Sequence, residues 1–589
     1  MNKSPSPATT QNSSGVAARS HFHEKGRRLW VVLALAAVLV VTGCAPYARV
    51  SSVQPQFRVS GSALGAFALS EQINDALRQE KREPLEAIGG FLAAAQTAEQ
   101  QIARDPANIA ARDAYNFAVA RVIGTIQQAR LDPWTHPLRV PSAGGDFVLT
   151  HKRNVDPRYN PACYDLIPAD QLRINGAYLG EREVKPGIGA PVVAVERHTN
   201  KPARDDFMMP KLYHGVTALI RFENGRAVIS YEDPLATERV RFAGHSIPLA
   251  ADFTAPIALL LAQQNPRKLE LSGLLHPGNA AEPARLSRTQ PHDPNKTVVL
   301  IIHGLKDSPA TWVPMLNHLQ ADEELRRSYQ VWFYSYPTGY PYPHSAAILR
   351  HELDAIERRF PLREKMVVIG HSMGGCIARL LITDTGDKLW REIFQMLPGQ
   401  TALSASSKAQ LREDLIFRHR PEIGRVIFIA APLRGSELAR DWVGRIGSAL
   451  VKLPSTELNK GNDAIRAVTF HRDELRMERA PNSVDFLTPN NRFVRAIQTI
   501  PVRPGVPHHV ICADRGKGGH KDKTRPVMTD GVVPYWSSHM ETAESELIVP
   551  SGHGAHQNRQ AIAEVGRILK MHASVSLDSF RLIRRAKPE

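Results

Sequence analysis

One glycine-rich turn constrains the fold of this chain more than any other feature. Residues 370–375 read GHSMGG and lie between a β-like apolar run, Met366–Ile369, and an apolar run with helical spacing, Cys376–Ile382. A strand can turn this sharply into a helix only where small residues flank the turn, and the central side chain is then lifted above the end of the strand. We therefore predict a strand–turn–helix unit that presents the hydroxyl of Ser372 as a nucleophile.

Apolar strands alternate with helical stretches throughout residues 297–575. This alternation favours a mostly parallel sheet with helices on both faces. The strand runs are almost continuously apolar, which is typical of strands buried on both faces. We expect an α/β fold whose strands are Val298–Ile302, Val331–Tyr334, Met366–Ile369, Val426–Ala430, Val510–Ala513 and Leu547–Val549.

A serine hydroxyl is a weak nucleophile until a base takes its proton, and the base is in turn oriented by an acid. The acid candidates are Asp530, in the sequence TDGVVP, and Asp514, directly after a predicted strand. Two histidines, His553 and His556, follow the last predicted strand. We assign the base to His553, because glycines on both sides leave room for its ring. His556 lies near the start of a helical pattern, where a packing or capping role is more common.

Residues 297–570 resemble the bacterial α/β-hydrolase lipases and esterases, including those akin to the GPI inositol-deacylase. The resemblance rests on the turn around Ser372 and on four further pieces: His303-Gly304, the sequence AAPLRGS at residues 430–436, Asp530-Gly531 and His553. It implies the α/β-hydrolase fold with a mostly parallel sheet, and a triad of Ser372, Asp530 and His553. The loop of Asp530 resembles the acid loop of bacterial lipases, which favours it over its rival.

The same resemblance implies an oxyanion hole made by the backbone N–H groups of Leu305 and Met373, with His303 as a residue that holds its loop. It also implies that no metal or organic cofactor takes part. The substrate that it favours is a carboxylic ester with an apolar acyl group, attacked through an acyl-enzyme. Two alternatives stay open: an acyltransferase with the same triad, and a non-catalytic envelope scaffold with a relic hydrolase region.

The first 44 residues have the parts of a secretory signal. Arg27 and Arg28 precede an apolar run, Leu29–Val41, that is too short to span a membrane comfortably. The segment resembles a bacterial lipoprotein signal that ends in Gly-Cys. This resemblance implies lipidation of Cys44, removal of residues 1–43, and an envelope location on the outer membrane, since the residue after Cys44 is not aspartate. An uncleaved N-terminal anchor helix is the alternative.

Three further regions separate Cys44 from the α/β region. Residues 44–61 predict a tether, and residues 62–135 a helical pair with a turn at residues 105–108 that looks like a single tetratricopeptide-type hairpin. Residues 138–285 predict a small β-rich domain, with the clearest hairpin at Asn224-Gly225. Residues 278–296 are polar and predict a linker. The sequence names no protein partner for the region before residue 290.

Composition narrows the partners. The formal net charge of +16 is compatible with anionic partners such as lipid headgroups, but an ordinary basic surface without a particular partner is the interpretation that we favour. We find no zinc-finger spacing, RNP motif or basic-plus-heptad helix, so nucleic acid is not expected.

The stretches 387–420 and 436–506 could shape a pocket. In the first, Trp390, Ile393, Phe394, Met396 and Leu397 predict either a lid or a helix packed permanently on the core.

Overall fold

A computed structural model describes most of the chain after residue 47. The described residues are 48–57, 64–153, 160–176, 178–197, 207, 213–264, 284–288, 290–305, 307, 309–400, 403–438, 483–516 and 528–585. The predicted signal sequence and Cys44 lie outside them, as do residues 439–482 of the second possible pocket stretch. Among the described residues, no helix combines the length and apolar character needed to cross a bilayer.

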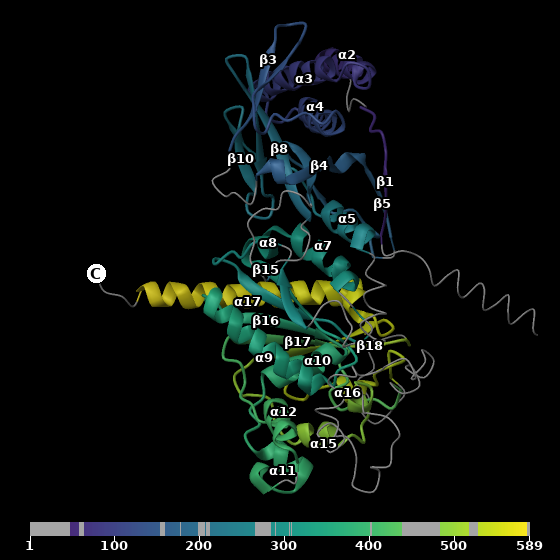
Figure 1. The fold of residues 1–589 in the computed structure, drawn as a ribbon, viewed down its shortest axis with the longest axis vertical. Helices are drawn as coiled ribbons and strands as arrows, with labels where there is room; N and C mark the ends of the chain where they lie inside the picture. Colours follow the sequence, from purple (N-terminus) through teal and green to yellow (C-terminus); the bar gives the residue numbers. More distant parts are fainter. Residues whose placement is uncertain are drawn as a thin grey trace, which may run out of the picture. The chain divides into compact units, whose positions relative to one another are not determined.

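The C-terminal half is built around a seven-stranded sheet (Figure 1). Its order is β13-β15-β14-β16-β17-β18-β19, and β13 alone runs antiparallel to its neighbour. The strands are β13 (Arg285–Arg288), β14 (Thr297–Ile302), β15 (Tyr329–Ser335), β16 (Met366–His371), β17 (Ile423–Ile429), β18 (His508–Asp514) and β19 (Ser545–Pro550). All six predicted strands are therefore present, and the prediction of a mostly parallel sheet is confirmed.

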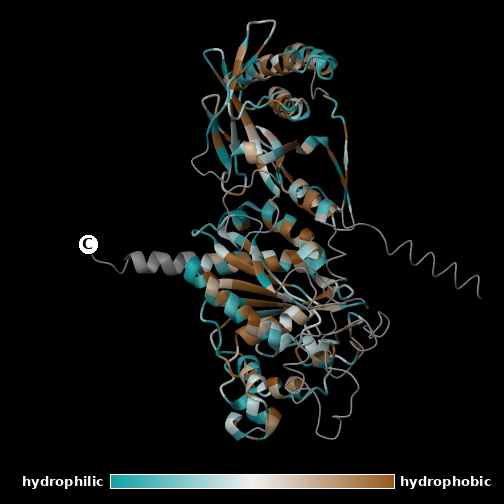
Figure 2. Ribbon diagram, in the orientation of Figure 1, coloured by the Kyte–Doolittle hydropathy of each residue, from teal (hydrophilic) through white to brown (hydrophobic). Residues whose placement is uncertain are grey.

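Both faces of this sheet are buried, as the apolar runs predicted. Along β14, the side chains of Val298, Leu300 and Ile302 join one apolar core, while those of Val299 and Ile301 join another. The strands are accordingly brown in Figure 2. The first core contains residues of α9 (Tyr342–Arg359), α10 (Met373–Leu381), α11 (Lys388–Phe394), α12 (Ala405–Leu415) and α15 (Arg492–Gln498). The second contains residues of α7 (Val313–Ala321), α8 (Glu323–Ser328) and α17 (Arg559–Arg585).

The edge strand β13 lies where a linker was predicted. Its sequence is RLSR, in which a single apolar residue, Leu286, points into the core. Arg288 is nevertheless buried, and its guanidinium lies over the rings of Trp332 and Phe360, with centroid distances of 5.8 and 4.5 Å. Cation–π packing of this kind replaces the apolar pattern by which we recognised the other strands.

In residues 62–135, where two helices were predicted, the described part of the chain forms three: α2 (Leu64–Gln79), α3 (Pro84–Arg104) and α4 (Ile109–Gln128). Pro84 begins α3, because its ring suits the first turn of a helix. The turn between α3 and α4 lies at the predicted residues 105–108. A six-stranded sheet follows, made of β2 (Leu138–Val140), β3 (Phe147–His151), β4 (Tyr164–Pro168), β7 (Ala190–Glu196), β8 (Tyr213–Glu223) and β9 (Arg226–Glu232).

These helices and this sheet share one apolar core. Tyr115 of α4 links them directly: its hydroxyl donates to the Ile220 carbonyl at 2.6 Å and accepts from the Ile220 N–H at 2.8 Å. The predicted hairpin turn joins β8 and β9, with Asn224 and Gly225 both at positive φ. Smaller elements complete the region: β1 (Arg49–Ser52), β5 (Leu172–Asn175), β6 (Val184–Lys185), β10 (Arg239–Phe242), β11 (His245–Pro248), β12 (Ala251–Asp252) and α5 (Thr254–Gln264).

Candidate active site

The predicted turn occurs between β16 and α10. Ser372 has φ 52° and ψ −125°, a strained conformation for a residue with a side chain. The two flanking positions, Gly370 and Gly374, have no room for a side chain. A Cβ on Gly370 would lie 2.5 Å from the Gly374 carbonyl oxygen, and one on Gly374 would lie 2.2 Å from the Ile302 carbonyl oxygen. The sequence GHSMGG thus lets β16, α10 and β14 approach closely enough to hold Ser372 in this position.

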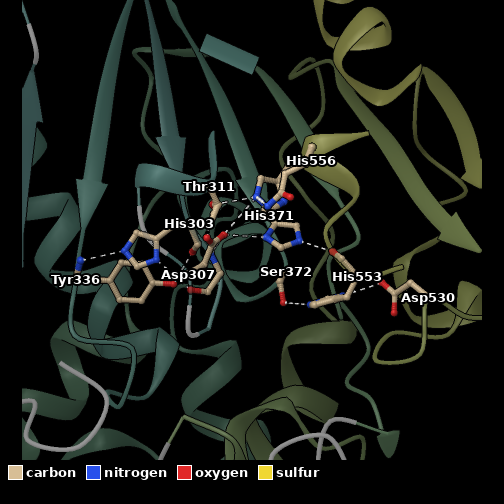
Figure 3. Close-up of polar contacts among 11 residues, drawn as sticks. His303, Asp307, Thr311, Tyr336, His371, Ser372, Asp530, His553 and His556 are labelled. Atoms are coloured by element: carbon tan, nitrogen blue, oxygen red, sulfur yellow. Dashed lines mark hydrogen bonds and ion pairs between the residues drawn. The ribbon is translucent and has the colours of Figure 1, made fainter. Parts of the chain in front are cut away.

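The structure brings together Ser372, His553 and Asp530 from three separate segments (Figure 3). The Ser372 Oγ lies 2.8 Å from His553 Nε2, and His553 Nδ1 lies 2.7 Å from Asp530 Oδ2. The other carboxylate oxygen of Asp530 accepts from the N–H groups of Val532 and Val533, each at 2.7 Å. Because Asp530 is buried and already hydrogen-bonded, it is held in place to orient the imidazole.

The rival acid and the rival base lie elsewhere. Asp514 Oδ1 accepts from the Gly516 N–H at 2.9 Å and so closes a turn after β18. His556 is buried, with its Nε2 3.0 Å from Thr311 Oγ1. Burial, and then the neighbouring His371, hold the pKa of His556 well below its usual value. A histidine that resists protonation in this way is poorly suited to take the serine proton.

The loop after β14 passes directly beside the nucleophile. A Cβ on Gly304 would lie 2.9 Å from the Ser372 Cβ, so only glycine allows this approach. The Leu305 amide follows in the same loop. The Met373 amide is in the first turn of α10, where helical N–H groups have no acceptor within the helix. The predicted oxyanion hole would thus take one amide from the loop that passes beside Ser372 and one from the helix that begins directly after it.

His303 holds this loop through Tyr336. The two rings are stacked with centroids 4.5 Å apart, and the Tyr336 hydroxyl donates to the His303 carbonyl at 2.8 Å. The Tyr336 N–H donates to His303 Nε2 at 3.4 Å. Burial is the main reason why the pKa of His303 lies below its usual value. A neutral, doubly held ring agrees with the structural role expected for His303.

Residues 298–565 match the model of the Alpha/beta hydrolase family. This part of the chain has the α/β-hydrolase fold. No curated protein sequence matches the chain.

Solved structures of low identity are similar to a little under half of the chain. A mature lipase of Bacillus licheniformis is 17% identical, with 49% of this chain and 99% of that one covered and a TM-score of 0.29. A lipase-esterase related protein of Clostridium acetobutylicum is 12% identical, with 49% and 99% covered and a TM-score of 0.27. A phospholipase of Legionella pneumophila is 14% identical, with 41% and 45% covered and a TM-score of 0.24.

The loop after β17 fastens the acid loop of the hydrolase. Ser436 donates its hydroxyl to the Val532 carbonyl, beside Asp530. Ser537 donates to the Gly435 carbonyl at 2.5 Å and accepts from the Arg434 N–H at 3.3 Å. The AAPLRGS piece of the sequence resemblance therefore supports the loop that carries the acid, a role that its sequence did not reveal.

The helix expected to act either as a lid or as core belongs to the core in the hydrolase. Trp390 and Ile393 of α11 are fully buried. Both belong to the apolar cluster that also contains Phe493 of α15. Phe394 and Met396 are partly covered, and Leu397 is 40% exposed. A helix that buries its largest side chains this completely is anchored, so the packing alternative describes it.

A buried polar cluster behind Ser372 was not predicted. Asp307, Thr311, His371 and His556 lie together beneath the elbow (Figure 3). Asp307 and Thr311 follow the oxyanion loop, and His556 follows the loop that carries His553. The sequence indicates no role for His371 beyond its place in the turn that carries Ser372. These residues are far apart in the chain, so no local pattern in the sequence pointed to their association.

Proposed function

We propose that the hydrolase cleaves carboxylic esters through a triad of Ser372, His553 and Asp530. The observation that carries this proposal is the continuous chain of hydrogen-bond distances, 2.8 Å from Ser372 to His553 and 2.7 Å from His553 to Asp530, ending on a strained serine. A merely structural serine does not need a positive φ. The strained backbone is explained by a turn between β16 and α10 that presents the Ser372 hydroxyl to a substrate.

In the proposed reaction, Ser372 Oγ attacks the ester carbonyl carbon while His553 Nε2 takes the hydroxyl proton. Asp530 stabilises the imidazolium that forms. The N–H groups of Leu305 and Met373 stabilise the oxyanion. The tetrahedral intermediate collapses when the C–O bond to the alcohol breaks and His553 protonates the leaving oxygen. Water, deprotonated by His553, then attacks the acyl-enzyme and releases the carboxylic acid and free Ser372.

We further propose that the substrates have apolar acyl groups and that the hydrolase works at a lipid surface. The support is the N-terminal sequence, which has the form of a lipoprotein signal ending at Cys44. Lipidation there would tether the protein at an envelope membrane by several acyl chains, because a single chain binds a bilayer only marginally. Such a tether would keep the site close to lipid esters.

The test is hydrolysis of p-nitrophenyl esters of graded acyl length by protein lacking residues 1–44. We expect turnover that rises with acyl length, and rapid labelling of Ser372 by a fluorophosphonate probe. Ser372→Ala should lose activity on the order of 10⁴-fold or more, with an unchanged circular-dichroism spectrum. A protein that neither hydrolyses any ester nor reacts with the probe would support the non-catalytic scaffold. Acyl transfer to an added alcohol in preference to water would support the acyltransferase.

A further inference from the structure

The cluster behind Ser372 joins the two loops that the proposed reaction must keep in register. Asp307 Oδ2 lies 3.4 Å from the Gly304 N–H, on the loop that carries the oxyanion hole. The same oxygen lies 3.2 Å from His371 Nδ1. The other ring nitrogen of His371, Nε2, lies 2.7 Å from the backbone carbonyl oxygen of His553. His371 therefore bridges the oxyanion loop and the backbone of the candidate base (Figure 3).

The hydrogen bonds around Asp307 require a carboxylate. Its Oδ1 accepts from the Thr311 hydroxyl, and its Oδ2 accepts from the Gly304 N–H. Burial raises the pKa of Asp307, but the surrounding histidines, with the hydrogen bond from His371 among their effects, outweigh burial and hold this pKa below its usual value. Both oxygens are thus acceptors, and neither is left to donate a proton to His371.

His371 consequently faces an acceptor on each side. The carboxylate of Asp307 lies at Nδ1, and a backbone carbonyl, which can only accept, lies at Nε2. A neutral imidazole carries one N–H and could satisfy only one of these partners. His371 makes both hydrogen bonds only when both of its ring nitrogens carry a proton.

The same accounting leaves His556 neutral. His556 Nε2 lies 3.0 Å from Thr311 Oγ1, whose single proton is used toward Asp307, and 3.3 Å from the side-chain amide nitrogen of Gln557. Its Nδ1 is buried and has no hydrogen-bond partner, which suits a nitrogen without a proton. The rings of His371 and His556 have centroids only 4.0 Å apart. Two imidazolium cations at that distance would repel each other, so we assign the single positive charge of this histidine pair to His371.

We propose that Asp307 and His371 form a buried carboxylate–imidazolium pair that fixes the position of His553 relative to the oxyanion loop. The proposal rests on the proposed ester hydrolysis, in which these are positioning residues that touch neither the substrate nor the reacting atoms. Gly304, Asp307, His371 and the His553 backbone form one hydrogen-bonded series. Through it, the N–H groups that receive the oxyanion and the imidazole that moves the proton are set by a single rigid connection.

The first test reads the protonation of His371 without any turnover. Full-length protein in detergent is labelled with [¹⁵N]histidine, and the His371 ring signals are identified from their loss in His371→Gln. We expect the ¹⁵N shifts of two protonated ring nitrogens. In Asp307→Asn, the amide can donate to His371 Nδ1, so His371 should keep its bond to His553 with one ring proton fewer.

The second test measures the effect on the reaction. Asp307→Asn should lower kcat for a p-nitrophenyl ester by about 10- to 100-fold with KM changed less than about twofold, since a small displacement of reacting groups costs rates of this order. The double variant Asp307→Asn/His371→Gln should be no slower than His371→Gln alone, because both changes break one connection. Asp414→Asn is the matched control: this buried acid faces His344 Nδ1 at 3.3 Å, and kcat should stay within about twofold of the parent.

Several results would overturn the pair. One is a single ring proton on His371 in the unmodified protein, and another is additive losses in the double variant. A third is a tightly bound metal ion whose removal by a chelator abolishes activity, because Asp307, His371 and His556 place three ligand atoms within 4.8 Å of one another. The two proposals fail separately. An inactive protein with a doubly protonated His371 contradicts the esterase alone, whereas an active protein with a singly protonated His371 contradicts the pair alone.

Discussion

The hydrogen bonds of the surrounding loop, and not closeness to a strand along the chain, distinguish the acid of the candidate active site. Asp514 is the last residue of β18, but its carboxylate closes its own turn by accepting from the Gly516 N–H. Asp530 comes 16 residues later, and its loop gives two amides to one oxygen and leaves the other for His553. The choice between them could be made from the sequence only through the resemblance of the Asp-Gly loop to lipases, because hydrogen-bond partners are set by the folded loop.

Asp530→Asn should lower kcat/KM for a p-nitrophenyl ester on the order of 10⁴-fold, because an amide leaves the imidazole wrongly oriented. Asp514→Asn should change it less than about threefold, since an asparagine oxygen can still accept from the Gly516 N–H. Steady-state kinetics on both variants check this. Inactivity of Asp514→Asn together with an active Asp530→Asn would move the acid to Asp514.

The two histidines of the last loop should behave differently. His553→Ala removes the group 2.8 Å from Ser372 Oγ, so hydrolysis and fluorophosphonate labelling should both be lost. His556→Ala removes a buried ring that contacts Thr311, so we expect it to lower the free energy of unfolding by about 1–3 kcal/mol and to leave much of the labelling. Labelling rates and urea unfolding of the two variants measure these effects. The reverse pattern would assign the base to His556.

The elements that we predicted from periodicity are those whose burial is simple. The strands β14 and β16 are almost continuously apolar and buried, and their sequences show it. β13 is buried through an arginine over aromatic rings, which no apolar pattern records. The cluster of Asp307, His371 and His556 was missed for a related reason. His371 and Asp307 are 64 residues apart, and His556 and Thr311 are 245 apart, so only the folded sheet brings them together.

The strand β18 carries a histidine that should make the fold sensitive to acid. Arg425 donates to His509 Nε2 at 2.5 Å, and His509 Nδ1 lies 2.7 Å from Ser545 Oγ, so the ring is bound as a neutral group. Burial, and then Arg425, lower the pKa of His509 from 6.5 to about 4. The unfolded chain takes up this proton near pH 6.5, whereas the folded chain does so only near pH 4.

The stability that His509 contributes is therefore present above about pH 6.5 and is lost as the pH falls toward 4, at a rate of about 1.4 kcal/mol per pH unit at most. Urea unfolding between pH 4 and pH 8 should show this slope. His509→Gln should be less stable than the parent at pH 8 and should show a shallower dependence on pH. An equal slope in both proteins would assign the acid sensitivity to other groups.

At the scale of the whole molecule, the N-terminal helices and their sheet share a single core, whereas the C-terminal sheet has a core on each face. The hydrolase machinery that we describe belongs entirely to the C-terminal half. The attachment of the protein to an envelope membrane is instead a prediction from the sequence of residues 1–44. Residues 44–589 carry a formal net charge of +12, the whole-chain +16 less the +4 of residues 1–43, which would favour an anionic membrane surface once the chain is held there.

Cys44→Ser should release the protein from the membrane fraction of a bacterial host, because the proposed anchor is lipid attached to this residue. Fractionation followed by a high-salt wash separates lipid anchoring from adsorption by charge. Cys163→Ser is the matched control, since Cys163 is a buried cysteine remote from the signal. A Cys44→Ser protein that stays in the membrane with residues 1–43 uncut would favour the anchor helix.

The strained backbone of Ser372 also has a meaning for protein engineering. A residue with a side chain held at φ 52° costs on the order of 1–3 kcal/mol, and glycine at the same place would be nearly free of that cost. A laboratory selection that rewards heat resistance alone would therefore favour replacement of the nucleophile itself. Selection for a durable catalyst from this scaffold has to score turnover and thermal tolerance in the same round, because at Ser372 the two demands oppose each other.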